Sequence, residues 1–379
     1  MATNGVTYRS TRGGASGMRF ESVVLAGLAP DRGLYVPESM PSFSPAEIEA
    51  MRTYSFEDQA FAIMSKFISR SEIPEADLRS LVNKSYKSFR DPLVTPVVKT
   101  GNVHTLELFH GPTFAFKDVA LQFLGNLFEY FIGKKQGSER RLTIMGATSG
   151  DTGSAAIYGL RGKANVNCFI LYPKGRVSAI QERQMATVPD SNIHCLCVEG
   201  NFDDCQDIVK GAFMDKSFRD EVKLGAVNSI NWARVLAQIT YYFHAYYQVT
   251  ATGKDPNRKI NFSVPTGNFG DILAGYYAKR MGLPVGQLIV GTNENDILHR
   301  FFTTGYYEKK SAQASISPSM DICVSSNFER YLFHLMGENP DHIRNLMQAF
   351  ESKGSAAKSV DTPVGKGSPG LLHVPPGVL

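Results

Sequence analysis

The spacing of apolar residues is helical near the N-terminus of the chain. The segment SPAEIEAM, which begins at Ser44, opens with the Ser-Pro pair typical of a helix start. The following segment, SFEDQAFAIMSKFI, repeats its apolar residues at helical intervals, which places several of them on one face. That predicted face consists of Phe56, Ala60, Ile63, Met64 and Phe67. We therefore predict that residues 1–95 form a small, mainly helical N-terminal unit.

From His104 onward the apolar pattern changes to short runs that alternate with segments of helical period. The runs are HTLELF, RLTIMGAT, NCFILYP, HCLCVEG, KINFSVP and QLIVGTN. Their nearly continuous apolar character indicates strands that are covered by helices on both faces of a sheet. Residues 96–350 are therefore predicted to form an α/β region of doubly wound, mostly parallel sheets with crossover helices. In such sheets ligands bind where the strands end, so the residues after each run are candidates for chemistry.

Composition and charge exclude several classes of protein. Hydrophobic residues make up 43% of the chain and charged residues 20%, as in folded globular proteins. The formal charge is only +4 and no long Lys/Arg block occurs, which argues against nucleic acid as the main partner. No apolar run is long enough to span a membrane, and no secretory leader is recognisable, so we expect a cytoplasmic protein. Nothing in the sequence indicates an obligate protein partner.

The sequence lacks the common metal and nucleotide motifs. Its cysteines fit neither a zinc knuckle nor a redox C-x-x-C pair, and no metal site is predicted. Walker A, H-E-x-x-H and G-x-G-x-x-G patterns are also missing. Residues 351–379 are rich in glycine and proline and have no periodic apolar face, so we predict that they are disordered.

The first chemically distinctive junction is LELFHGPTFAFKD, where a predicted strand leads through a turn to Lys117. Lys117 follows Phe114, Ala115 and Phe116 at a predicted helix start, a setting that desolvates an amine and lowers its pKa. A neutral amine is a nucleophile, so Lys117 is a candidate Schiff-base lysine. The alternative is a lysine that extends to solvent while Asp118 caps the helix.

The second junction follows RLTIMGA and consists of Thr148, Ser149, Gly150, Asp151 and Thr152. Small residues allow a ligand to approach the backbone, and the N-terminus of the following helix favours an anion. The alternative is an ordinary turn in which Asp151 or Thr152 caps the helix.

The third junction follows KINFSVPT and consists of Gly267, Asn268, Phe269, Gly270 and Asp271. It predicts a second anion cradle, to which Asp271 contributes its backbone N–H while its carboxylate caps the helix. Two anion cradles and a desolvated lysine on one sheet point to a cofactor that carries both a phosphate and a carbonyl group. Pyridoxal 5'-phosphate (PLP) is such a cofactor.

The same segments resemble the threonine synthase family, specifically its fungal-type branch. The resemblance lies in HGPTFAFKDVALQF, GATSGDTGSAAIYGLRGK, NSINWARVLAQITYYF and PTGNFGDILAGYYAKRMGLP, and it extends from Tyr8 to about Phe350. It implies a fold type II PLP enzyme, similar in fold to the tryptophan synthase β subunit. The implied reaction converts O-phospho-L-homoserine and water to L-threonine and phosphate.

The resemblance also implies a role for each junction. Lys117 matches the lysine that forms the Schiff base with PLP and moves protons at Cα and Cβ of the substrate. The loop from Gly267 to Asp271 matches the segment that holds the cofactor phosphate. The loop from Thr148 to Thr152 matches the one that receives the substrate carboxylate, with Asp151 near the cofactor's O3'.

The substrate phosphate needs cations in addition to these loops. The candidates, chosen for their charge, are Arg234 in NWARV, Lys174 and Arg176 in YPKGRVS, and Arg12 in STRG. For each of them the alternative is a surface salt bridge.

Two features depart from the family pattern. Residues 351–379 match no part of the family, and the family's Ser or Thr at the cofactor's pyridine nitrogen has no counterpart here. Arg32 in LAPDRGLYVPE stands where the family usually has Gly, at a position that favours positive φ. Two alternative functions therefore stay open. One is a catalytically silent PLP-fold product with a binding or regulatory role, and the other is a phospho-lyase that releases 2-oxobutyrate and phosphate.

Overall fold

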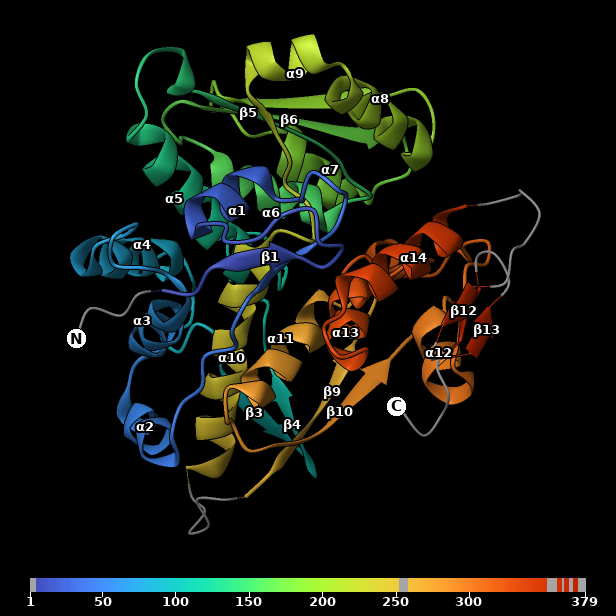
Figure 1. The fold of residues 1–379 in the computed structure, drawn as a ribbon. Coiled ribbons are helices and arrows are strands. Elements are labelled where there is room, and N and C mark those ends of the chain that lie inside the picture. Colours follow the sequence, from blue (N-terminus) through green and yellow to red (C-terminus); the bar gives the residue numbers. More distant parts are fainter. Residues whose placement is uncertain (1–4, 252–257, 353–359, 363–364, 368–370, 374–379) are drawn as a thin grey trace.

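The computed structural model describes residues 5–251, 258–352, 360–362, 365–367 and 371–373. Its N-terminal part consists of four α-helices, a short 3₁₀ helix (Met51–Thr53) and one antiparallel strand pair, and it packs beside the long helix α10 (Figure 1). The elements of this part are β1 (Tyr8–Ser10), α1 (Phe20–Ala26), β2 (Tyr35–Pro37), α2 (Pro45–Ala50), α3 (Phe56–Phe67) and α4 (Glu75–Tyr86). The division of the chain near residue 95 stays a prediction.

The start of α2 and the buried face of α3 confirm the helical pattern. Ser44 caps α2 by accepting the N–H of Glu47, and the Glu47 carboxylate accepts the N–H of Ser44 in return. All the apolar residues predicted on one face of α3 are buried. They pack toward α4 and α10, so the helical period alone identified the side of α3 that faces the core.

A four-stranded parallel sheet forms one half of the α/β region, with strand order β7, β6, β5, β8. Helices α8 and α9 lie above this sheet in Figure 1, and α6 and α7 lie below it. The elements are β5 (Leu142–Ala147), α6 (Asp151–Leu160), β6 (Val166–Pro173), α7 (Ala179–Ala186), β7 (Ile193–Val198), α8 (Phe202–Met214), α9 (Lys216–Val222) and β8 (Leu224–Gly225).

The other half is built around α10, whose side chains are buried along nearly its whole length. Helices α5 and α11 pack against α10, and strands β9 and β10 pair in parallel next to α11. The elements are α5 (Asp118–Gly133), α10 (Trp232–Thr250), β9 (Ile260–Pro265), α11 (Gly270–Arg280), β10 (Val285–Gly291) and α12 (Ile297–Thr304). The ends of β5 and β9 carry the second and third junctions.

One predicted strand has a different partner than expected. HTLELF forms β4 (Val103–Leu106), which pairs antiparallel with β3 (Val97–Thr100) in a largely exposed hairpin. It is not a strand of a buried parallel sheet, so that part of the prediction is wrong. The cause is the two-residue turn Gly101-Asn102, in which Gly101 has a φ of 61°. A Gly-Asn pair between two short apolar runs is itself a hairpin signal.

The C-terminal part contains α13 (Phe328–Leu335), α14 (Pro340–Glu351) and β11 (Tyr306–Glu308). Beyond α14, the structure describes three short strands: β12 (Val360–Thr362), β13 (Gly365–Gly367) and β14 (Leu371–His373). Strand β14 pairs antiparallel with β11, and β12 pairs with β13. Most of the segment 351–379, which we predict to be disordered, lies outside the described residues.

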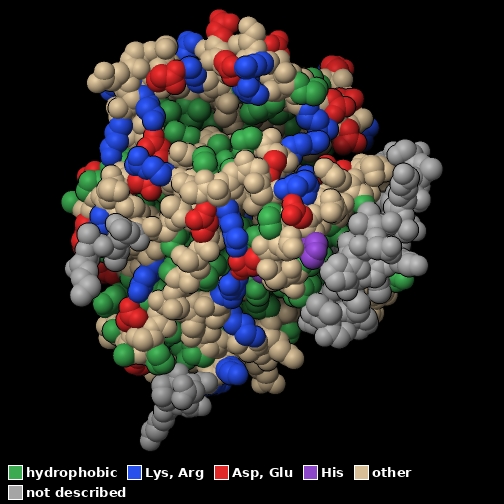
Figure 2. Space-filling view, viewed as in Figure 1, with side chains coloured by type: hydrophobic (Ala, Val, Ile, Leu, Met, Phe, Trp, Pro, Cys, Tyr) green, Lys and Arg blue, Asp and Glu red, His purple; other side chains and the backbone are tan. Residues whose placement is uncertain are grey.

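The surface mixes charges of both signs. On the face shown in Figure 2, lysine and arginine side chains are interspersed with acidic ones instead of forming a continuous basic area. Among the described residues, no helix has the length and apolar content needed to cross a membrane. The same residues contain no cluster of three His, Cys, Asp or Glu side chains arranged for a metal ion.

Candidate active site

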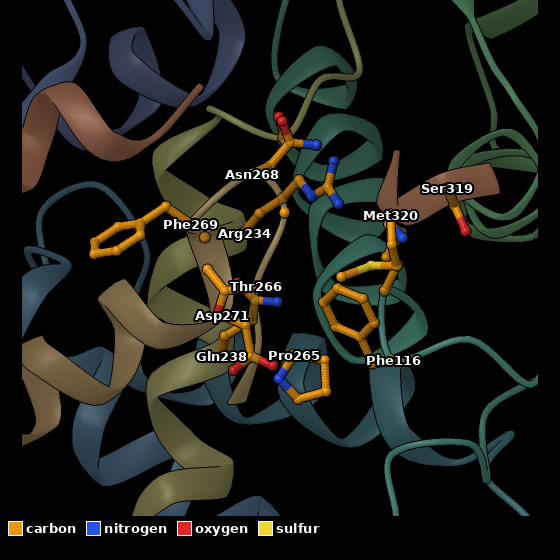
Figure 3. A pocket seen from close by; sticks show the side chains of 14 residues that line it. Phe116, Arg234, Gln238, Pro265, Thr266, Asn268, Phe269, Asp271, Ser319 and Met320 are labelled. Atoms are coloured by element: carbon orange, nitrogen blue, oxygen red, sulfur yellow. The ribbon is translucent and has the colours of Figure 1, made fainter. Parts of the chain in front are cut away.

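A pocket lies where α5, α10 and α11 approach one another, at the carboxyl end of β9. Figure 3 shows its walls, which come from four segments far apart in the sequence. The lining residues are Phe116 and Lys117; Ser229, Arg234 and Gln238; residues 265–271; and Ser319 with Met320. The pocket therefore unites the first and third junctions with Arg234.

Lys117 is the residue immediately before α5, and its side chain is buried. Its Nζ is ion-paired with Asp151 and lies 4.5 Å from the centroid of the Phe116 ring. Burial lowers the pKa of Lys117 below the usual lysine value, although the charge of Asp151 acts in the opposite direction. Because Lys117 is only 7% exposed, the alternative of a lysine that extends to solvent is wrong.

The turn before Lys117 is held from two sides. Asp118 accepts hydrogen bonds from the backbone N–H and the hydroxyl of Thr113, at 2.8 and 2.7 Å. The guanidinium of Arg90 donates to the carbonyls of Gly111 and Pro112 and lies 3.9 Å from the centroid of the Phe114 ring. Sequence reasoning missed Arg90, because nothing in its local sequence connects it to a turn about twenty residues downstream.

In the loop from Thr148 to Thr152, some backbone N–H groups form hydrogen bonds with a side chain of the loop itself. The Thr148 hydroxyl accepts the N–H groups of Gly150 and Gly153, at 3.0 and 2.8 Å. Gly150 has a φ of 146°, a backbone conformation that strains residues with a side chain and favours glycine. Asp151 reaches Lys117 and so joins the second junction to the first. Ser149 and Thr152 are half-buried beside them.

The loop from Gly267 to Asp271 lines the pocket directly. Phe269 precedes α11 with a left-handed φ of 63°, and its ring is buried among other aromatic rings. We expected the Asp271 carboxylate to cap α11, and this is wrong. Its Oδ1 instead accepts hydrogen bonds from the hydroxyls of Tyr241 and Tyr242, at 2.6 and 2.8 Å. Burial raises the pKa of Asp271, while these two hydrogen bonds act in the opposite direction.

Of the four candidate cations, the structure brings only Arg234 into the pocket, where it lies beside Asn268 in Figure 3. Its Nη1 is buried and has no hydrogen-bond partner in the described part of the chain. Burial lowers the pKa of Arg234 to about 10, against the opposing effect of the Asp151 charge. A buried guanidinium with an unsatisfied donor is suited to receive an anionic group.

The other three cations lie elsewhere. Lys174 is exposed and paired with Glu199, so the alternative of a surface salt bridge describes it. Arg176 is also exposed. Arg12 is buried but is already paired with Glu329 and Glu351, both at 2.8 Å. The three positions therefore do not contribute to the pocket.

The residues present fit PLP as the cofactor. Lys117 supplies a buried amine, and the N-terminus of α11 presents backbone N–H groups beside it. Arg234 adds a cation with an unsatisfied donor. An aldehyde, a phosphate and a further anion would each find a complementary group in one pocket.

The family comparisons cover most of the chain. Residues 7–86 match the family described as "Threonine synthase N terminus", and residues 94–348 match "Pyridoxal-phosphate dependent enzyme". Threonine synthase of Schizosaccharomyces pombe is 57% identical over 356 residues, which are 89% of this chain and 69% of that protein. Threonine synthase of Pseudomonas aeruginosa is 53% identical over 348 residues, which are 92% of this chain and 72% of that protein.

Solved structures give the same result. Threonine synthase from yeast superposes with a TM-score of 0.89 at 48% identity, covering 98% of this chain and 74% of that one. PLP-bound threonine synthase from Brucella melitensis gives 0.87 at 49% identity, covering 92% and 74%. These identities extend through both family regions and the pocket residues lie within them, so the chain belongs to the threonine synthase family of PLP-dependent enzymes.

Proposed function

We propose that this chain converts O-phospho-L-homoserine and water to L-threonine and phosphate, with PLP as its cofactor. The observation that carries the proposal is a single pocket holding a buried lysine, a glycine-containing helix N-terminus and a buried arginine with an unsatisfied donor. O-phospho-L-homoserine as the small-molecule substrate and a cytoplasmic location are both part of this proposal.

In this proposal three groups of the protein each bind one anion: the cofactor phosphate, the substrate phosphate or the substrate carboxylate. The loop from Gly267 to Asp271 holds the cofactor phosphate, because it precedes α11 and opens into the pocket. Arg234 receives the substrate phosphate, since a charged donor left unsatisfied in a buried site is stabilised by an anion. The loop from Thr148 to Thr152 receives the substrate carboxylate beside Asp151.

When bound, PLP withdraws electrons from the carbon atoms attached to it and makes their C–H bonds acidic. Lys117 is suited to accept and return the proton at its Nζ, because its burial favours the neutral amine. Asp151 contacts that nitrogen and stabilises the ammonium form once the proton has been taken up. The two effects bring the neutral and charged forms of the amine closer in free energy, which favours proton transfer in both directions.

The walls of the pocket control access of water to this chemistry. The Phe116 ring and the Met320 side chain lie next to each other in Figure 3 and cover the side opposite the loop from Gly267 to Asp271. Apolar walls raise the strength of the electrostatic contacts inside and limit unwanted hydrolysis. The reaction requires one water molecule, so the site must admit water without being flooded by it.

The test uses the full 379-residue chain with added PLP. We expect an absorption band of protein-bound cofactor that borohydride abolishes, and we expect Lys117→Ala never to show it. Lys174→Ala is the matched control, because this exposed lysine lies outside the pocket, and it should retain the band. A folded parent chain without the band would contradict the proposal and favour a catalytically silent product.

Product analysis separates the remaining alternative. With O-phospho-L-homoserine as substrate, the proposal predicts L-threonine and phosphate in equal amounts. Formation of 2-oxobutyrate in place of L-threonine would identify a phospho-lyase.

A further inference from the structure

Three consecutive residues outside the predicted site, Ser325 to Asn327, contact the loop that lines the pocket. The Ser325 hydroxyl donates to the carbonyl of Gly267. The backbone N–H and the side-chain amide of Asn327 both donate to the carbonyl of Asn268, at 3.0 and 3.1 Å. Two successive carbonyls of the loop are therefore fixed by a segment almost sixty residues away in the sequence.

These contacts determine where the next N–H groups point. In a planar trans peptide the C=O of one residue and the N–H of the next point in opposite directions. Because the carbonyls of Gly267 and Asn268 face Ser325 and Asn327, the N–H groups of Asn268 and Phe269 face the other way. In the described part of the chain these two N–H groups donate to no protein acceptor.

Phe269 extends this arrangement. Its left-handed φ of 63° is followed at once by the first turn of α11. A left-handed residue next to right-handed ones brings successive N–H groups together into an anion-binding concavity. The anchored carbonyls and the left-handed residue thus act together to expose several donors on one side of the loop.

The orientation of the Asn327 amide is itself fixed. Arg330 is fully buried and donates to Asn327 Oδ1 at 2.6 Å, so the amide nitrogen must face the carbonyls of Asn268 and Ser229. The same guanidinium donates to the carbonyls of Ile230 and Tyr35. Asn327 therefore has one orientation, and it connects two walls of the pocket.

We propose that Ser325 and Asn327 are positioning residues for the cofactor phosphate, which act by anchoring the carbonyls of Gly267 and Asn268 so that the following N–H groups point at the phosphate. This inference rests on the proposed function, because it assigns a phosphate to the loop. It predicts that Ser325 and Asn327 affect the phosphate part of the cofactor and leave its aldehyde part unaffected.

The experiment compares the affinities of the full chain for PLP and for pyridoxal, which lacks the phosphate. In Ser325→Ala and in Asn327→Asp we expect the Kd for PLP to rise about tenfold, as for the loss of one to two hydrogen bonds. The Kd for pyridoxal should stay unchanged. Ser325→Thr keeps the hydroxyl and should give the same ratio of the Kd for PLP to the Kd for pyridoxal as the parent chain. The matched control is Ser317→Ala, which changes an exposed serine nearby.

The variants are compared only if they unfold at the same temperature as the parent chain. An equal loss of affinity for PLP and for pyridoxal would then overturn the inference, because it would indicate a general loosening of the site. An unchanged affinity for PLP would also overturn it. Asn327→Asp keeps the oxygen that Arg330 contacts, and Ser325→Ala removes a single hydroxyl. If one of these variants misfolds, the other still tests the inference.

Inorganic phosphate separates this inference from the proposed function. A parent chain that binds phosphate but not PLP would contradict the proposed function, and the anchoring would then be tested by the phosphate Kd of Ser325→Ala. We expect that Kd also to rise several-fold. A parent chain that binds neither ligand would contradict both.

Discussion

The two glycine-containing loops after β5 and β9 look alike in sequence but direct their backbone groups differently. In the loop after β5, Thr148 accepts two N–H groups of its own loop. In the loop after β9, the carbonyls of Gly267 and Asn268 are held from outside, by Ser325 and Asn327. The first loop thus uses donors internally, whereas the second leaves them exposed.

This difference shows that two glycine-rich turns of similar sequence, each before a helix, can expose different sets of N–H donors. The decisive contacts are those of the carbonyls, because they fix the direction in which the N–H groups point. In the loop after β5 the main polar feature that reaches the pocket region is the Asp151 carboxylate, which meets Lys117. One loop therefore supplies a negative charge beside the lysine, and the other supplies neutral donors.

The largest expected effect is at Arg234, the cation that lines the pocket together with the loop after β9. Arg234→Gln removes a buried charge that has an unsatisfied donor, so kcat/KM for O-phospho-L-homoserine should fall by about 10²- to 10³-fold. Burial lowers the pKa of Arg234 to about 10, which means that the charged guanidinium destabilises the folded chain when no ligand is bound. Replacing it with the neutral Gln should therefore raise the unfolding temperature of the chain without ligands. Steady-state kinetics and thermal unfolding measure the two effects.

Lys174→Ala is the control for Arg234, since its charge is exposed and paired with Glu199. It should change kcat/KM by less than about twofold. A loss of activity together with a loss of stability in Arg234→Gln would show that the arginine supports the fold instead of binding an anion.

The next effect compares the threonines that open the two loops. Thr148→Val leaves the N–H groups of Gly150 and Gly153 without their acceptor, so the free energy of unfolding should fall by about 2 kcal/mol. Thr266 precedes the other loop, but its hydroxyl donates to the carbonyl of Val264 and accepts no loop N–H. Thr266→Val should therefore cost about 1 kcal/mol or less in urea unfolding. Equal losses would contradict the difference between the loops.

Much of this site was predictable from local sequence, and the remainder was not. Lys117 next to aromatic residues and the two loops were recognisable, because each depends on neighbouring residues. The partners of these groups were not, since Asp271 meets Tyr241 and Tyr242 through packing of α10 on α11. Ser325 and Asn327 lie in an irregular segment whose sequence has no period or motif.

A pH experiment can test the unequal roles of the two loop aspartates. Only the neutral amine of Lys117 reacts with pyridoxal, and burial lowers its pKa, so trapping by borohydride should have its midpoint below the usual lysine value. Asp151→Asn removes the partner that favours the charged amine, so the midpoint should move to still lower pH. Asp271→Asn should move it in the same direction but less, because Asp271 contributes less to the pKa of Lys117. A larger shift in Asp271→Asn would reverse the assigned roles.

The smallest expected effect measures the backbone strain that the loop after β9 carries at Phe269. Arg32 has nearly the same φ as Phe269, 67° against 63°, but its side chain is 77% exposed and lies outside the pocket. Arg32→Gly should therefore raise the free energy of unfolding by up to about 1 kcal/mol, because glycine adopts positive φ without a Cβ clash.

Phe269→Gly removes the same backbone strain but also a buried ring, so the chain should lose about 2–4 kcal/mol, as in other cavity-forming substitutions. Adding the gain measured at Arg32 to this net loss gives the packing contribution of the Phe269 ring. If Arg32→Gly were neutral or destabilising, positive φ at these residues would carry no measurable strain. The left-handed residue of the loop after β9 would then be held in place by the ring packing alone, at no cost to the fold.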